Sequence, residues 1–102
     1  MGKRERGIQT DIIEEAVHIY DQRIWIRVKH GDGYAVVGDP DIYGCLDGIF
    51  FGFEVKNEDN QLTKIQLHRL KEIRTASGHG YAVRSVQDAM HYLADIATIR
   101  GR

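Results

Sequence analysis

The alternation of apolar and polar residues is clearest between positions 38 and 56, where Asp47-Gly48 separates two runs of strand-forming residues. An Asp-Gly pair in this setting favours a two-residue type I′ turn, because both central residues of that turn have positive φ. Such a turn pairs Leu46 with Ile49, and the register of the hairpin follows by counting outward. The second strand then has an apolar face that can pack against a core, made of Ile49, Phe51, Phe53 and Val55.

The opposite face of the second strand carries two charged residues near its end, Glu54 and Lys56. The same counting places Asp41 opposite Glu54 and Asp39 opposite Lys56. Directly opposed side chains lie about 4.5–5.5 Å apart at Cβ, and opposed like charges destabilise a sheet. Two facing carboxylates therefore need a cation or a raised pKa. The positive charge of Lys56 offsets part of the repulsion between the carboxylates. A divalent ion such as Mg²⁺ would offset it better, because it commonly binds through one or two carboxylates.

Apolar residues at helical spacing predict three helices outside the hairpin. The first covers residues 5–20. The second starts with Thr63 as its N-cap and runs to about Ser77, with Gly78 or Gly80 past its end. The third covers residues 86–98. Each helix has an apolar stripe, so each should pack one side against the sheet.

Alternating residues predict the remaining strands. Residues 24–29 form a strand, residues 30–33 a turn, and residues 34–37 a short returning strand. A further strand at residues 81–84 follows the second helix. This strand should lie parallel to the second strand of the hairpin, because a helix connects the two.

Glu5 projects onto the apolar stripe of the first helix, where a carboxylate is unusual. An acid at this position interacts favourably with the helix dipole, which is one explanation for it. A role in an inward-facing site is the other explanation. Glu15 lies at the edge of the same stripe and is the second candidate for that role.

Gln66 also has two explanations. Thr63-x-x-Gln66 is a capping box, in which side chains and backbone N–H groups bond reciprocally at the start of a helix. Gln66 shares a helix face with Leu70 and Ile73 as well, so its side chain should point toward the sheet. These residues alone leave both explanations open.

Taken together, these residues resemble a known family. Pro40-Asp41 followed by Glu54-Val55-Lys56 resembles the PD-(D/E)XK nuclease signature. The VRR-NUC branch is the nearest resemblance, and it extends from about residue 5 to residue 93. It rests on three segments, Glu5-x-x-Ile8-Gln9, Gly38-Asp39-Pro40-Asp41-Ile42 and Glu54-Val55-Lys56, and on the later Gln66.

The resemblance implies a mixed α/β, restriction-endonuclease-like fold. Its αβββαβ core is arranged in three layers, and here an additional C-terminal helix follows. We expect a single domain over residues 1–102. The branch contains metal-dependent nucleases, including small stand-alone phage-type proteins that resemble Holliday-junction resolvases. It also contains domains that are fused to larger DNA repair enzymes.

The resemblance also implies a metal site. Asp41, Glu54 and the carbonyl oxygen of Val55 would hold Mg²⁺ or Mn²⁺, and Glu5 would complete this site or support a second ion. Phosphodiester hydrolysis needs an activated water and neutralised phosphate charge, which such an ion supplies.

Three further residues have implied or open roles. Lys56 would orient or help to deprotonate the attacking water, and Gln66 would position Lys56 or a phosphate. Asp39 either pairs with Lys56 or is a bystander that the kink at Pro40 displaces. Catalysis is therefore assigned to Asp41 and Glu54 together with Lys56 and Gln66.

Composition adds limits to this picture. The formal net charge is −1, so a DNA-binding surface must be a local patch. Arg27 and Lys29 on the first strand either contact phosphates or form a solvated strand face. Cys45 is the single cysteine, which fits a reducing, cytoplasmic setting, and the resemblance to phage-type members agrees with an intracellular protein of phage origin. The sequence has no signal peptide and no apolar run near the roughly 20 residues of a membrane span, and its histidines lack zinc-ligand spacing.

The expected function is a metal-dependent DNA endonuclease that selects branched DNA such as Holliday junctions. The alternatives are an exonuclease or nicking enzyme that needs partner proteins, and a non-catalytic nucleic-acid-binding module. Cutting two strands with one site per chain requires a homodimer. The helices of so small a domain should cover one face of the hairpin, which leaves Phe50, Tyr43 or Trp25 for the partner.

Overall fold

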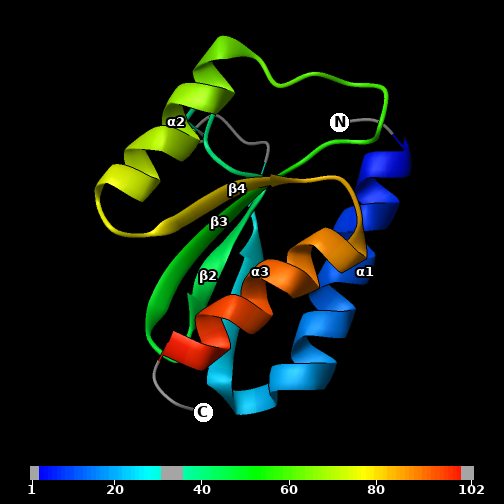
Figure 1. The fold of residues 1–102 in the computed structure, drawn as a ribbon. Helices are drawn as coiled ribbons and strands as arrows, with labels where there is room; N and C mark the ends of the chain where they lie inside the picture. The colour runs from blue at the N-terminus through cyan, green and yellow to red at the C-terminus, as the bar shows by residue number, and fades with distance from the viewer. Residues whose placement is uncertain (1–2, 31–35, 100–102) are drawn as a thin grey trace.

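The computed structural model describes residues 3–30 and 36–99, which form a four-stranded sheet with three α-helices (Figure 1). In chain order the elements are α1 (Lys3–Tyr20), the 3₁₀ turn η1 (Asp21–Arg23), β1 (Ile24–Val28), β2 (Ile42–Leu46), β3 (Ile49–Val55), α2 (Lys64–Thr75), β4 (His79–Val83) and α3 (Val86–Ile99). This is the predicted αβββαβ core with an additional C-terminal helix. None of the helices in the described part of the chain is long and apolar enough to cross a membrane.

The sheet has the strand order β1-β2-β3-β4. β1, β2 and β3 are antiparallel neighbours, and β4 pairs with β3 in parallel, as expected for strands that a helix connects. Leu46 pairs with Ile49 and Ile42 with Phe53, which is the predicted register. Asp47 and Gly48 have φ values of 52° and 82°, so the turn has the positive φ at both central residues that type I′ requires.

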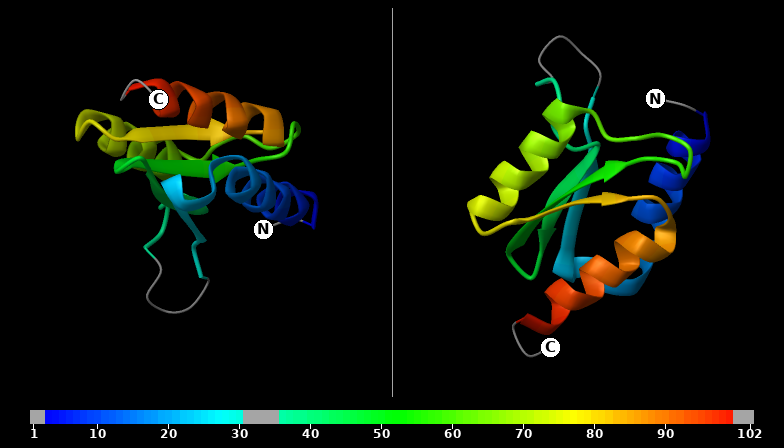
Figure 2. Two further views of the ribbon diagram at one scale, coloured as in Figure 1. Left: turned by 90° about the horizontal axis from the view of Figure 1, so that it is seen from below. Right: turned by 45° about the horizontal axis from the view of Figure 1, so that its top comes forward.

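The sheet lies between two helical layers. Figure 2 shows α2 on one side of the strands and α1 with α3 on the other. Phe53 faces Tyr92 of α3, with ring centroids 6.1 Å apart. On the opposite face, a Cβ added to Gly52 would lie 2.9 Å from Cγ of Pro40 and 3.3 Å from Cδ1 of Ile73 in α2. Gly52 therefore lets Pro40 and α2 approach the sheet next to Asp41.

The main core lies between the sheet and the layer of α1 and α3. Its largest fully buried side chains come from all these elements and are Phe51, Phe53, Ile12, Ile42, Leu46, Leu93, Ile96, Val55 and Val83. The apolar face of β3 that the alternation predicts is the face in this core. Complete burial of a leucine, isoleucine or phenylalanine contributes about 1.5–3 kcal/mol each, so this layer fixes the position of the hairpin.

The second face of the sheet is covered in part, which corrects the expectation that helices cover one face. α2 packs over β3 and β4, where its Leu70 is 3% exposed. The part of this face on β1 and at the start of β3 keeps large aromatic side chains at the surface. Trp25 is 47% exposed and Phe50 is 45% exposed.

The end of α2 also differs from the prediction. The residue with left-handed backbone is Ser77, with φ of 71°, and not a glycine. Ser77 N donates to Arg74 O at 3.0 Å and Gly78 N donates to Ile73 O at 2.9 Å, which is the Schellman pattern of hydrogen bonds. Gly78 is needed for space, because a Cβ there would lie 2.9 Å from Cγ2 of Ile73.

The connection between β1 and β2 shows a further difference. The predicted strand at residues 34–37 is wrong for Val36 and Val37, which are exposed and lie outside any strand. Residues 31–35, which hold most of the predicted turn, lie outside the described residues. Asp39 N donates to Val36 O at 3.2 Å, so the chain turns just before Pro40.

Candidate active site

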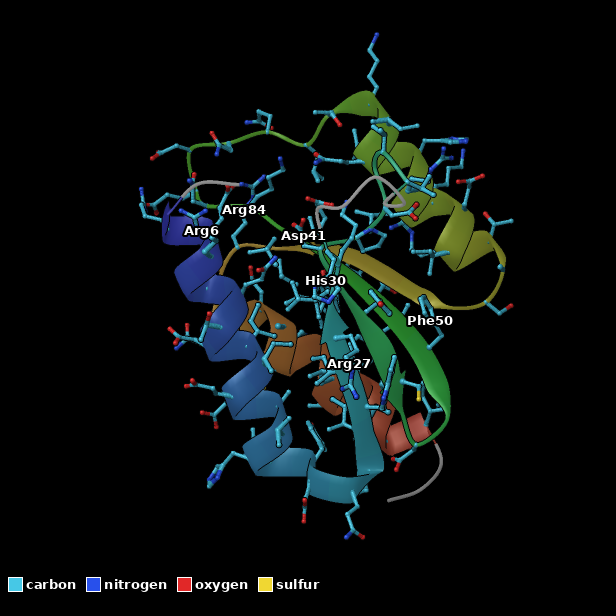
Figure 3. All side chains as sticks on the ribbon, turned by 180° about the vertical axis from the view of Figure 1, so that it is seen from behind. Arg6, Arg27, His30, Asp41, Phe50 and Arg84 are labelled. Carbon is cyan, nitrogen blue, oxygen red and sulfur yellow. The ribbon has the colours of Figure 1, made fainter. Side chains whose placement is uncertain are left out.

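Asp41 lies one residue before β2, at the point where the pairing with β3 ends (Figure 3). Its backbone carbonyl accepts a hydrogen bond from Lys29 N at 2.7 Å. Its side-chain Oδ2 accepts one from Val55 N at 2.9 Å. The carboxylate therefore replaces a backbone acceptor for β3, and both ends of Asp41 are held in place.

Glu54 lies beside Asp41, as the hairpin register predicts, and is 3% exposed. The pKa of Glu54 is raised to about 8, first by burial, then by a hydrogen bond with Asp41 and by the negative charge of Asp41. The charges of Lys56 and Lys29 act in the opposite direction. At neutral pH the metal-free pair therefore keeps a proton. The sequence predicts that facing carboxylates need either a cation or a raised pKa, and the raised pKa is present here.

Gln66 connects the start of α2 to this carboxylate pair. Its Oε1 accepts from Thr63 N at 2.9 Å, and Gln66 N donates to Thr63 Oγ1 at 3.2 Å. Its remaining polar atom, Nε2, donates to Glu54 Oε2 at 3.2 Å. The capping box and the bond to the site are therefore simultaneous, and the two explanations from the sequence both hold.

Lys56 follows β3 and is half-buried. Its backbone N donates to Val83 O at 3.0 Å, which extends the parallel pairing with β4 by one residue. The ammonium group is close enough to Glu54 to lower the pKa of that carboxyl. Lys56 therefore lies at the site, on the side of the pair that leads into the loop at residues 57–62.

Asp39 does not continue the simple register opposite Lys56. Its carboxylate lies 3.7 Å from Nε of Arg69 in α2, and its carbonyl oxygen accepts from Lys29 Nζ at 2.8 Å. The turn before Pro40 takes Asp39 out of line with β3. Of the two alternatives for Asp39, displacement at Pro40 is the one that the structure supports.

Glu5 points inward and is 6% exposed, whereas Glu15 is exposed on the surface of α1. Glu5 Oε2 accepts from Asn57 N and from Asn60 Nδ2, both at 3.2 Å. These bonds attach the loop that follows Lys56 to the first helix. Glu5 is thus the inward carboxylate of the two candidates, and its role at a metal stays a prediction.

Arg84 is a residue of this region that the sequence does not single out. Its Nη1 donates to the carbonyl oxygens of Asn57 and Asn60 at 2.6 and 2.7 Å. Figure 3 shows Arg84 near the N-terminal end of α1. Glu5 and Arg84 therefore bind the same loop from two sides. No local sequence motif predicts these hydrogen bonds, because Arg84 is far from the loop in sequence.

The two basic residues predicted to bind nucleic acid lie on the second face of the sheet. The guanidinium of Arg27 lies 4.4 Å from the ring centroid of Trp25, and Arg27 Nη1 donates to Ile26 O at 2.8 Å. Lys29 lines a groove on this face, and its positive charge is close enough to Glu54 to lower the pKa of that carboxyl.

The donor set fits a hard divalent cation. Within residues 3–30 and 36–99, no group of three or more His, Cys, Asp or Glu side chains could hold a metal. Asp41 and Glu54 form a close pair, and the Val55 carbonyl belongs to the same end of β3. Mg²⁺ is typically bound through one or two carboxylates, with water and substrate phosphate as further ligands. A carboxylate pair that holds a proton, with Glu54 buried and Asp41 partly exposed, is suited to exchange that proton for a cation.

Comparison with known proteins identifies the architecture. No family model matches the sequence, and no curated protein matches it. A solved structure described as a VRR_NUC domain matches with a TM-score of 0.70 at 20% sequence identity, covering 91% of this chain and 97% of that chain. The fold is that of a VRR-NUC domain. Within this VRR-NUC fold, the Asp41–Glu54 pair lies where the β2–β3 hairpin meets α2, and the roles of these residues rest on the geometry given above.

Proposed function

We propose that this chain is a metal-dependent nuclease that hydrolyses phosphodiester bonds in DNA. The observation that carries the proposal is the Asp41–Glu54 pair, in which a nearly buried carboxyl has its pKa raised to about 8. Strongly perturbed ionisable groups with a specific charged partner are candidates for function. The structural relative is described as a VRR_NUC domain, which supports a nuclease-type activity.

Asp41, Glu54 and the Val55 carbonyl would hold Mg²⁺ or Mn²⁺. When bound, the ion would neutralise phosphate charge and supply an activated water. Lys56 orients the attacking water and stabilises the negative charge that develops on the phosphate. Gln66 fixes the orientation of the Glu54 carboxylate through its Nε2 bond. Glu5 and Arg84 hold the loop after Lys56, and this restricts where the Lys56 side chain can lie.

The preferred substrate that we propose is branched DNA, such as a Holliday junction, cut by a homodimer. A junction is resolved by cuts in two strands of opposite polarity. One chain offers one carboxylate pair at the hairpin end, so a two-fold dimer would supply two sites with matching symmetry.

The experiment is cleavage of a labelled four-way junction, with linear duplex and single strand of the same sequence as controls. We expect paired cuts in the junction with Mg²⁺ or Mn²⁺, and none with EDTA. Cleavage of the linear substrates from their ends, or single nicks, would replace the endonuclease assignment by the exonuclease or nicking alternative. Binding without any cleavage in either metal would contradict the nuclease proposal and favour a non-catalytic module.

A further inference from the structure

The second face of the sheet carries a row of aromatic and basic side chains that the proposed chemistry does not use. We call it the aromatic–basic strip, and it consists of Trp25, Arg27, Lys29, Tyr43 and Phe50. Arg27 pairs across the sheet with Tyr43 and Trp25 with Cys45, which in turn pairs with Phe50. Figure 3 shows Arg27 and Phe50 over the strands, beside the part of the face that α2 covers.

The rings of the strip are held in place and remain accessible. Trp25 and Tyr43 have ring centroids 6.1 Å apart, and the Arg27 guanidinium lies 4.4 Å from the Trp25 ring. Trp25 and Phe50 are 47% and 45% exposed. Large aromatic side chains left half-exposed on a rigid sheet, next to cations, offer flat surfaces for a planar partner.

A groove runs from the strip to Pro40, the residue before Asp41. It has a volume of about 420 Å³ and is lined by Lys29, Val36, Asp39, Pro40, Tyr43, Phe50 and Ile73. Pro40 precedes Asp41, and the charge of Lys29 acts on Glu54. A chain that enters along the groove from Phe50 therefore reaches Pro40 and Lys29, next to the residues of the candidate site.

The charges of the strip favour a polyanion over a second copy of this chain. Arg27 and Lys29 are both cationic, and the nearby Asp39 carboxylate is compensated by Arg69 at 3.7 Å. In a two-fold interface the same patch meets itself, so cations of one copy would approach those of the other. A nucleic acid strand satisfies both features, because its phosphates meet the cations and its bases stack on the rings.

We propose that the aromatic–basic strip binds unpaired nucleotides of the DNA strand next to the bond that is cut. Bases in a duplex are stacked on one another, so exposed rings can stack on bases only where the strand is unpaired. The proposal rests on the proposed function for the role of the site, and it adds a substrate requirement. An unpaired segment beside the cleavage point delivers the strand along the groove to Asp41.

Trp25 is the single tryptophan of the chain, so its fluorescence reports on the strip alone. The experiment titrates the protein with an oligothymidine strand in EDTA, where metal-dependent cleavage does not interfere. We expect quenching that saturates and that weakens as salt increases, with a log–log slope set by the number of phosphate contacts. A duplex of equal length should quench much less. Absence of quenching by the single strand would overturn the proposal.

Variants of Phe50 separate stacking from packing. Phe50→Ala should weaken binding by about fivefold or more, the scale for loss of one base–aromatic stack. Phe50→Leu keeps an apolar side chain without a ring and should be weakened to a similar extent. The matched control is Val17→Ala on α1, where the side chain is 46% exposed. Wild-type affinity in both Phe50 variants, or full rescue by leucine, would contradict stacking.

Arg27→Gln should reduce the salt slope by about 0.7, the value for one phosphate contact on a single strand. Arg6→Gln, an exposed arginine on α1, is the charge-matched control and should leave the slope unchanged. Quenching that depends on protein concentration in the absence of DNA would instead assign the strip to a dimer interface and overturn the proposal.

The two proposals fail separately. Quenching that depends on Phe50 in a protein that never cleaves DNA would support the strip and remove the nuclease function. Metal-dependent cleavage by a protein whose Trp25 fluorescence is unchanged by single-stranded DNA would overturn the proposal for the aromatic–basic strip and leave the nuclease proposal in place.

Discussion

Gln66 donates a hydrogen bond from Nε2 to Oε2 of Glu54 at 3.2 Å while its Oε1 caps α2. One side chain thus joins the first turn of a helix to the buried Glu54 carboxyl of the pair. Gln66 therefore couples the two: a movement of the start of α2 would strain the hydrogen bond to Glu54, and a movement of Glu54 would strain the capping hydrogen bonds.

Gln66→Glu separates these two contributions. Glutamate keeps the capping box, but it has no N–H to donate to Glu54 and adds a third carboxylate to the pair. We expect slower metal-dependent cleavage and lower stability of the metal-free protein near pH 8, measured by single-turnover kinetics and urea unfolding. Thr63→Ala is the control, since it removes the cap at a cost of about 1 kcal/mol and leaves the Glu54 bond in place. Equal cleavage rates in the two variants would contradict the role assigned to Nε2.

Asp41 has a structural role in addition to its charge. Repulsion between facing carboxylates alone predicts that Asp41→Ala would not lower the stability of the metal-free protein. However, Asp41 Oδ2 accepts a hydrogen bond from the N–H of Val55, which is buried. Asp41→Ala should therefore cost about 1–3 kcal/mol of unfolding free energy, the range for a buried donor left without its partner. Asp41→Asn keeps an acceptor and removes the charge, so its loss should be smaller. Equal unfolding free energies for the two variants would show that the Val55 bond contributes nothing.

The raised pKa of Glu54 predicts how stability depends on pH. Between 4.5, the ordinary value, and about 8, the folded state keeps a proton that the unfolded state has released. The contribution of Glu54 to stability is therefore greatest below pH 4.5, decreases as pH rises, and levels off above about pH 8. Glu54→Gln should remove this dependence in metal-free urea unfolding. A wild-type profile with the same slope as the variant would contradict the raised pKa.

Lys56 should act on the chemical step. Lys56→Ala is expected to lower the single-turnover cleavage rate by ~10²-fold, the scale of a positioned proton-transfer group. Binding of the DNA should change much less. Lys64→Ala, an exposed lysine at the start of α2, is the control and should cleave at the wild-type rate. A Lys56→Ala rate within a few fold of wild type would remove Lys56 from the mechanism.

The parts of the fold that follow from local chemistry could be predicted from the sequence. Asp47-Gly48 determines the turn, the turn determines the register of the hairpin, and this register brings Asp41 beside Glu54. Thr63 and Gln66 define the start of α2 for the same local reason. Gly78 lies beyond the end of α2 as predicted, but the left-handed residue there is Ser77, and Gly78 is needed instead for its close approach to Ile73.

Contacts between distant segments could not be predicted. Arg84 donates to the carbonyls of Asn57 and Asn60, and backbone acceptors leave no signature in side-chain identity. The displacement of Asp39 toward Arg69 depends on how α2 lies against the sheet. The pairing of Glu5 with the same loop likewise requires the packed arrangement of α1.

The central claim is that the Asp41–Glu54 pair is a metal-dependent catalytic site for cleaving DNA. The most direct test is single-turnover cleavage of a labelled four-way junction by wild-type protein and by Asp41→Asn and Glu54→Gln, each in Mg²⁺ and in EDTA. Circular dichroism would verify that the variants are folded. We predict cleavage by the wild type in Mg²⁺ alone, and none by either folded variant. Cleavage at the wild-type rate by a folded Glu54→Gln protein, or undiminished cleavage by the wild-type protein in EDTA, would contradict the claim.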